Sequence, residues 1–117
     1  MRSIFVTLST ALLFILGNPF SLPVSAQMSI QVTLTDSGIS PSEIEAVKGS
    51  ALHIEVKNAG QKTHNFVIPD MYVFSQNLAP GSSTSISFSP DKVGNFSYYS
   101  DTGGRPEPGL AGTLVVS

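Results

Sequence analysis

The stretch that decides the fold is residues 98–116, YYSDTGGRPEPGLAGTLVV. It begins with aromatic residues, continues as a segment rich in Gly and Pro, and ends in an apolar segment. Aromatic and β-branched residues favour strands, whereas Gly and Pro favour turns and loops. The stretch therefore predicts two strands that are joined by a long loop.

The rest of the chain continues this β pattern. Apolar and polar residues alternate in Ser29–Thr35 and Ala51–Asn58, and this period of two is typical of strands with one buried face. Shorter segments of strand composition are residues 44–47, 66–68, 84–88, 96–100 and 113–116. Turn signals separate them, and residues 70–78 have no clear period. The sequence predicts an all-β fold, a Greek-key β-sandwich or barrel with about seven strands.

Residues 1–26 have the parts of a signal peptide. Met1-Arg2 gives a positive start, Ile4–Leu16 is mostly apolar, and Val24-Ser25-Ala26 fits a small-residue cleavage site. The alternative is a membrane anchor, but the apolar run is short for a bilayer core of about 30 Å. We expect a signal peptide over 1–26 and one exported domain over 27–117. That domain would be periplasmic or extracellular, with no stable membrane span after cleavage.

Composition excludes several functions. The formal net charge of −2 gives no electrostatic support for nucleic-acid binding. The chain has no Cys, which removes disulfides, thiolate metal sites and thiol chemistry.

His53 is predicted to lie on a polar strand face beside Glu55, and no Ser-His-acid set is evident from spacing alone. We therefore expect a protein that is not an enzyme.

Three segments resemble the cupredoxin family, the blue-copper fold. Residues 39–49 resemble the family's second strand and the turn after it, and residues 58–66 resemble the segment with the first copper-binding His. Residues 96–116 resemble the ligand loop and the last strand. The resemblance covers nearly all of residues 27–117. It implies a β-sandwich of cupredoxin type, and for the family as a whole it implies copper binding and electron transfer.

The ligand positions implied by this resemblance are mostly changed. The family binds copper with two His, one Cys and usually an axial Met, and one common loop spacing is Cys-x4-His-x4-Met. This frame places Ser100, Arg105 and Leu110 at the three loop positions, so that only His64 matches. A hydroxyl is a poor ligand near neutral pH, a guanidinium keeps its protons, and Leu has no donor atom. A type 1 copper site is therefore not expected.

Other side chains leave two interpretations open. His64 is either a metal ligand or a packed, hydrogen-bonded loop residue. Asp101 and Glu107 either join His64 in an oxygen-rich site for a divalent metal, or are solvated acids of which Arg105 neutralises one. Met71 either packs or adds a thioether ligand.

The sequence thus predicts an exported cupredoxin-like accessory or binding protein without a type 1 copper site and without a cofactor. An unidentified protein or small-molecule partner is expected at the end that bears His64 and the loop Ser100–Leu110, where Ser100 and Arg105 would supply polar contacts. The alternative is a periplasmic protein that binds copper or another divalent metal, or transfers electrons, with a site rebuilt around His64.

Overall fold

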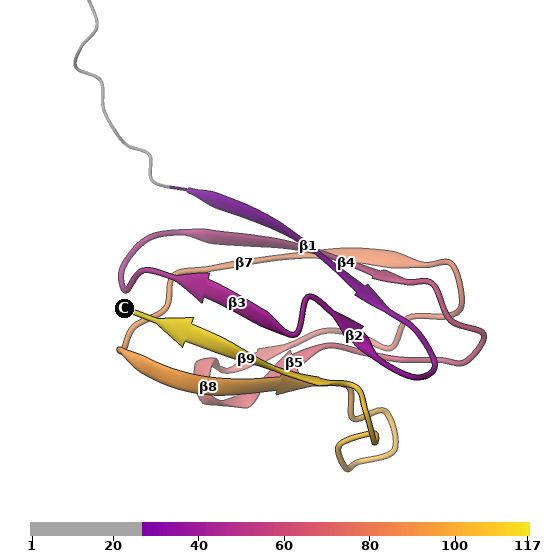
Figure 1. Cartoon of the computed structure of the whole chain (residues 1–117). Coiled ribbons are helices and arrows are strands. Elements are labelled where there is room, and N and C mark those ends of the chain that lie inside the picture. The colour runs from indigo at the N-terminus through magenta and orange to yellow at the C-terminus, as the bar shows by residue number, and fades with distance from the viewer. Residues whose placement is uncertain (1–26) are drawn as a thin grey trace, which may run out of the picture.

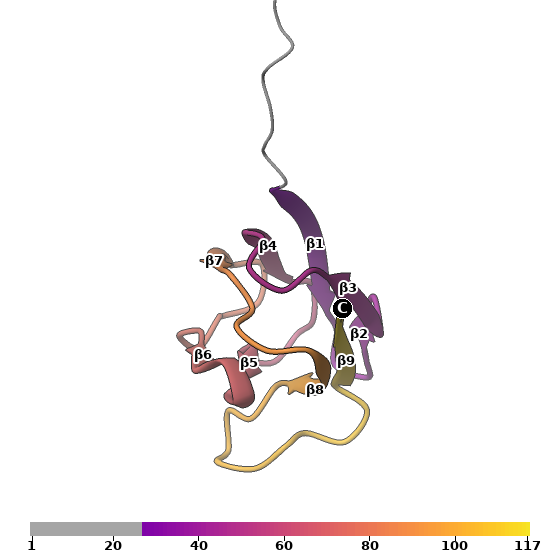
Figure 2. The ribbon, with the colours of Figure 1, turned by 90° about the vertical axis from the view of Figure 1, so that its left-hand side faces the viewer.

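A computed structural model describes residues 27–117, which form two β-sheets packed face to face (Figure 1 and, turned by 90°, Figure 2). The first sheet has the order β2 (Ile39–Ser40), β1 (Met28–Leu34), β4 (Leu52–Asn58) and β7 (Ser83–Phe88). The second has the order β3 (Glu43–Ala46), β9 (Ala111–Val116), β8 (Gly94–Tyr99), β5 (Val67–Ile68) and β6 (Val73–Phe74). One 3₁₀ turn, η3 (Pro69–Met71), joins β5 to β6.

The pairing is mixed. β1 is parallel to β4 and β3 is parallel to β9, while the other strand pairs are antiparallel. The predicted all-β sandwich of cupredoxin type is confirmed. The described residues contain nine strands instead of about seven, and the two additional strands, β2 and β6, have two residues each. A two-residue strand shows no alternation, so the period-two pattern did not reveal β2 or β6, whereas β5, of the same length, was indicated by its apolar composition before Pro69.

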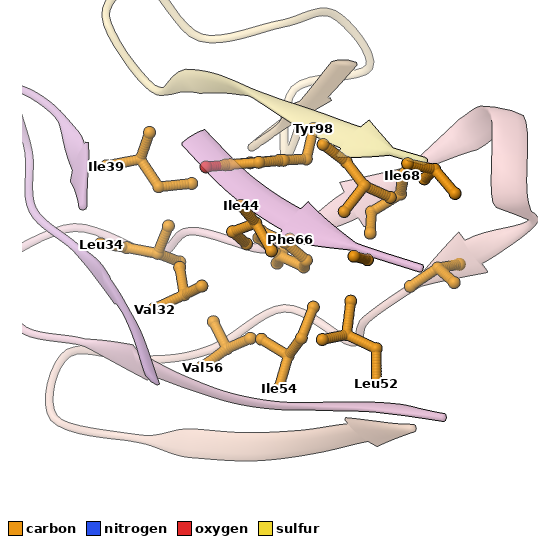
Figure 3. Close-up of a cluster of buried hydrophobic side chains, with 14 of the residues drawn as sticks. Val32, Leu34, Ile39, Ile44, Leu52, Ile54, Val56, Phe66, Ile68 and Tyr98 are labelled. Carbon is orange, nitrogen blue, oxygen red and sulfur yellow. The ribbon is translucent and has the colours of Figure 1, made fainter. Parts of the chain in front are cut away.

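The core lies between the two sheets and is built by the alternation along each strand (Figure 3). In β4, every second side chain from Leu52 to Asn58 is buried. The Phe66 and Tyr98 rings lie with centroids 5.3 Å apart at the centre of this core. The largest fully buried side chains are Tyr98, Phe66, Leu34, Ile44, Leu52, Ile54, Ile68, Leu110, Leu114, His64, Val32 and Val56.

Tyr98 also connects the two halves of the sandwich. Its hydroxyl donates to the carbonyl oxygen of Pro41, 2.6 Å away, in the segment where the chain passes from β2 to β3. Burial, with a smaller effect of the Glu43 charge, raises the pKa of Tyr98 to about 12, so the phenol stays protonated and can donate. Gly112 on β9 faces this ring, where a Cβ would lie only 2.4 Å from its carbons. β8 and β9 are thereby held firmly where the loop between them begins and ends.

The predicted signal peptide over residues 1–26 lies outside the described residues. Between residues 27 and 117, no helix has the length and apolar character that a membrane span requires.

Candidate functional site

Three connections meet at one end of the sandwich. They are the turn after β1, the connection from β4 to β5, and the loop from β8 to β9, which projects beyond the strands in Figure 1. Asp36 comes from the first, His64 and Asn65 come from the second, and Ser100 and Glu107 come from the third. Hydrogen bonds between these side chains join the three connections into one polar cluster, which we call the His64 cluster.

His64 is the centre of the cluster, and its side chain is only 1% exposed. Its Nε2 lies 2.9 Å from Asp36 Oδ1, and its Nδ1 lies 3.1 Å from Glu107 Oε1. Each ring nitrogen thus faces a carboxylate oxygen that can accept a hydrogen bond from it. With both nitrogens in these contacts, neither is directed at an open position where a metal could bind.

Asp36 connects the first two segments. Besides His64, its carboxylate accepts the backbone N–H groups of Gln61, at 2.9 Å, and Lys62, at 3.1 Å. The hydrogen bond from His64, followed by the one from the Gln61 amide, lowers the pKa of Asp36 below its usual value. The negative charge that faces Nε2 is therefore maintained at neutral pH.

Glu107 occupies the space between residues 64 and 100. Its Oε2 accepts from the Ser100 hydroxyl at 2.5 Å and from the Thr102 hydroxyl at 2.9 Å, while Oε1 faces His64. Burial works against ionisation of this carboxyl group. The hydrogen bonds from Ser100, Thr102 and His64 together outweigh burial and lower the pKa of Glu107.

A second set of hydrogen bonds fixes the start of the loop. The Ser100 hydroxyl accepts the backbone N–H of Asn65 at 3.0 Å, and Ser100 is fully buried. The Asn65 side chain accepts the Asp101 backbone N–H at 2.7 Å and donates to Asp101 Oδ1 at 2.9 Å. Asp101 is thus bound to Asn65 and takes no part in the contacts of His64.

Two glycines permit the close approach of the three connections. A Cβ on Gly60 would lie 2.3 Å from Asp36 Oδ1, so any larger residue would push Asp36 away. Gly109 has φ +83°, and a Cβ there would lie 2.8 Å from the carbonyl oxygen of Ser37. Both positions therefore need the absence of a side chain, and Gly109 also needs the left-handed backbone that Gly adopts readily.

The structure brings together only some of the predicted site residues. His64 and Glu107 are in contact, and the ion-pair partner of Glu107 within residues 27–117 is His64 rather than Arg105. Met71 lies on η3 and packs partly against the core. The prediction that Ser100 supplies a polar contact at the surface is wrong, because its buried hydroxyl is used inside the cluster. Arg105 is exposed.

Sequence reasoning missed Asp36, Asn65 and Thr102. Asp36 lies in an Asp-Ser-Gly turn, where Asp is common for local reasons, so its sequence context gave no sign of a partner 28 positions away. Asn65 directly follows His64, and only the pairing of the loops shows that its side chain holds Asp101.

The donor set can be compared with what a metal requires. Within residues 27–117, no group of three or more His, Asp or Glu side chains is placed to hold a metal ion. Asp36 and Glu107 bind different nitrogens of the His64 ring, so their oxygens do not converge with an imidazole nitrogen on one point. The chain has no Cys, and Leu110 is buried in the loop.

Comparisons with known proteins assign the family. A model of the cupredoxin-like domain matches residues 5–116, and the chain belongs to this family. No curated protein sequence matches the chain.

Solved structures show the same fold. The reduced auracyanin from the photosynthetic bacterium Roseiflexus castenholzii is 17% identical with a TM-score of 0.68, over 81% of this chain and 99% of that one. The metal-binding domain of the Cu(I)-exporting P-type ATPase of Streptococcus pneumoniae, solved with Cu(I), is 16% identical with a TM-score of 0.67, over 83% and 91%. The blue copper oxidase from Nitrosomonas europaea is 13% identical with a TM-score of 0.68, over 78% of this chain and 39% of that one. The fold is thus found in auracyanin, in a metal-binding domain and within a much longer oxidase, and it does not by itself decide the function of this chain.

Proposed function

We propose that this protein is an exported cupredoxin-like binding or accessory protein that lacks a type 1 copper site and whose loop end binds a partner without catalysis. Its partner, a protein or a small molecule, binds at the end of the sandwich that carries the loop between β8 and β9. The family membership and the export motif of the sequence support this proposal, and the His64 cluster gives it its chemical basis.

The observation that carries the proposal is the position of the Glu107 carboxylate. In the ligand pattern of the cupredoxin family, the residues that correspond to positions 64 and 100 bind the copper ion. Here Glu107 contacts both, with Oε2 at 2.5 Å from Ser100 Oγ and Oε1 at 3.1 Å from His64 Nδ1. A carboxylate held between an imidazole ring and a hydroxyl gives both groups a hydrogen-bond partner without a metal. The negative charge that binds the loop to His64 comes from the chain itself.

The loop has the properties of a recognition surface. Residues 103–106 are exposed, and they include the Arg105 guanidinium, which can form paired hydrogen bonds with carboxylates or phosphates. Residues on either side of this tip are fixed by Asn65, by Ser100 and by the bond from the Glu107 amide to the Ser100 carbonyl. A loop held at its base pays less ordering entropy when a ligand binds. Arg105 is therefore the first residue to test for partner binding.

The alternative function is a periplasmic protein that binds metal or transfers electrons, with Glu107 as a ligand beside His64. The partial exposure of the Asp36 and Glu107 side chains, 34% and 25%, favours it, because a cation could approach either oxygen from solvent. Asp101 and Met71 would require a rearrangement to take part, since Asp101 is bound to Asn65 and Met71 packs against the core.

Calorimetric titration of the purified chain with Cu(II), Cu(I) and Zn(II) separates the two functions. We expect no binding of micromolar affinity or tighter in the unmodified chain. Glu107→Gln removes the bridging charge and keeps the side-chain size, and Arg105→Ala is the matched control in the same loop. Micromolar binding that is lost in His64→Ala and in Glu107→Gln, but kept in Arg105→Ala, would replace the proposal with the metal-binding alternative.

Export is tested separately. The chain, expressed in a Gram-negative host, is expected in the periplasmic fraction with Gln27 as its first residue. Recovery of the uncleaved chain in the membrane fraction would indicate an anchor instead.

A further inference from the structure

The outer face of the four-stranded sheet carries a second polar cluster, on the paired strands β4 and β7. His53 lies opposite Ser87 in the pairing of β4 with β7, and Glu55 lies opposite Ser85. His53 Nδ1 is 2.8 Å from Ser87 Oγ, and His53 Nε2 is 3.0 Å from Glu55 Oε2. A hydroxyl, an imidazole and a carboxylate thus form one hydrogen-bonded chain, which we call the Ser87 relay.

The direction of the hydrogen bonds follows from the carboxylate. Bonds from Ser85 and then from His53 lower the pKa of Glu55, so it is ionised at neutral pH and can only accept. His53 Nε2 therefore donates to Glu55. In the tautomer whose one ring proton is on Nε2, Nδ1 accepts from the Ser87 hydroxyl, as a general base for a serine nucleophile must.

The sheet register explains why these side chains meet. The backbone N–H of Asn58 donates to the backbone carbonyl oxygen of Ser82. Because hydrogen-bonded pairs alternate along an antiparallel ladder, the even-numbered residues of β4 form the hydrogen-bonded pairs with β7. His53 and Ser87 therefore form a non-hydrogen-bonded pair, in which facing side chains are closest. The same alternation directs the backbone N–H of Ser87 away from β4. β7 is an edge strand of its sheet within residues 27–117, so this N–H points toward the open edge.

We propose that the Ser87 relay is a nucleophilic site that transfers acyl groups from small activated esters to the Ser87 hydroxyl and then to water. Ser87 and His53 are its catalytic residues, while Glu55 and Ser85 are positioning residues. This activity goes beyond the binding function proposed for the loop between β8 and β9 and does not depend on it.

The chemical step balances without any co-reactant except water. Ser87 Oγ bonds to the ester carbonyl carbon as its proton passes to His53 Nδ1. The bond to the leaving alcohol then breaks, and the alcohol takes that proton from His53, which leaves the acyl group on Ser87. Water attacks the acyl carbon with His53 again as the base, and this releases the carboxylic acid and restores Ser87.

The surroundings of the relay define the substrate class. The edge-directed N–H of Ser87 can donate to the carbonyl oxygen as negative charge develops on it, which is the function of an oxyanion hole. Ser85 and Ser87 are both exposed on an open sheet face, so no deep cleft orients a large substrate. Esters with good leaving groups, which need little assistance at the leaving oxygen, are therefore the expected substrates.

The test uses the full chain with p-nitrophenyl acetate, followed by a fluorophosphonate probe and peptide mass spectrometry. We expect a burst of p-nitrophenolate with acetyl and phosphonyl adducts on Ser87. Ser87→Ala and His53→Gln should each lower the burst rate at least about tenfold, as expected when a nucleophile or its base is removed. Ser83→Ala is the matched control, because Ser83 is exposed on the same strand and pairs with Lys57 instead of a His.

Three results would overturn the proposal. One is an unchanged burst in Ser87→Ala together with its loss in His53→Gln, which would make His53 itself the nucleophile. Another is adduct formation at Ser83 equal to that at Ser87. The third is no adduct on Ser87 in a folded chain, with folding verified by circular dichroism. For Glu55→Gln, ¹⁵N NMR of His53 should show loss of the Nε2–H tautomer along with the slower burst.

Discussion

Glu107 determines the chemistry of the His64 cluster. One carboxylate accepts the Ser100 and Thr102 hydroxyls with one oxygen and faces the imidazole with the other. With Asp36 on the other ring nitrogen, the buried ring is surrounded by two negative charges. A buried polar ring is stable only when its polar atoms have hydrogen-bond partners, and both ring nitrogens of His64 have one here.

The same residues predict how stability depends on pH. The pKa values of Asp36 and Glu107 are lowered from 3.8 and 4.5, so near these values the unfolded chain binds more protons than the folded chain. Their contribution to the free energy of unfolding is complete above these ordinary values and is lost as the pH falls through the lowered ones. Urea unfolding of the chain between pH 7 and pH 2 should show this decrease.

The double variant Asp36→Asn, Glu107→Gln is the control for this measurement. The double variant should be less stable at pH 7, and its free energy of unfolding should fall less on acidification. A smaller dependence on pH should remain, because the pKa of Glu55 is also lowered. Equal slopes in the two proteins would contradict the assignment of the acid dependence to the His64 cluster.

For single residues, the sequence identified His64 and Glu107 as candidate site residues but could not assign their contacts. Glu107 is 43 positions from His64, and Asp36 is 28 positions from it. Spacing along a strand or helix says nothing about pairs that meet only when separate loops pack. Asp101 has the same charge and lies in the same loop as Glu107, yet its carboxylate binds Asn65.

Among the elements, the loop between β8 and β9 depends on its contact with the turn after β1. Gly109 faces Ser37 across this contact, and its φ of +83° is unfavourable for other residues. The loop therefore keeps its place through backbone shape as well as through Glu107.

Gly109→Ala should consequently destabilise the protein by about 1–3 kcal/mol, because it adds both backbone strain and a clash with the Ser37 carbonyl. Thermal unfolding followed by circular dichroism measures this change. Gly103→Ala is the matched control, since a Cβ there meets nothing within 4 Å and its φ is not in the left-handed region. Equal effects of the two substitutions would contradict the proposed role of the contact.

Elements with regular patterns were predicted well. β4 was visible because its Leu, Ile and Val residues alternate with His, Glu and Lys, and burial drives that alternation. β6 was not visible, because Val73 and Phe74 gain their strand conformation only by pairing with β5. Such pairing is a tertiary contact that local composition does not encode.

For the whole molecule, the cupredoxin-like sandwich and the chemistry at its end are separable. The core of both sheets is apolar and independent of residues 100, 105 and 110, apart from the packing of Leu110. A family fold can therefore persist while its ligand positions change.

This separation can be tested by restoring the ligand set. We expect the chain with Ser100→Cys, Arg105→His and Leu110→Met to bind Cu(II) weakly, because Glu107 still occupies the space between positions 64 and 100. Adding Glu107→Ala should free His64 and give tight binding with the intense visible absorption of a copper–thiolate site. Absorption titrations of the two variants measure the difference. Equal affinity in both would show that Glu107 does not block the position.

The sequence by itself determined the all-β sandwich, the family resemblance and the loss of the thiolate, because these follow from alternation, turn residues and composition. Only the tertiary structure decided which acids surround His64, and only the register of β4 with β7 placed His53 beside Ser87. The physical reason is the same in both cases. Charged and polar side chains find partners across loops and strands that are distant in sequence, and only the packed sheets determine which of them meet.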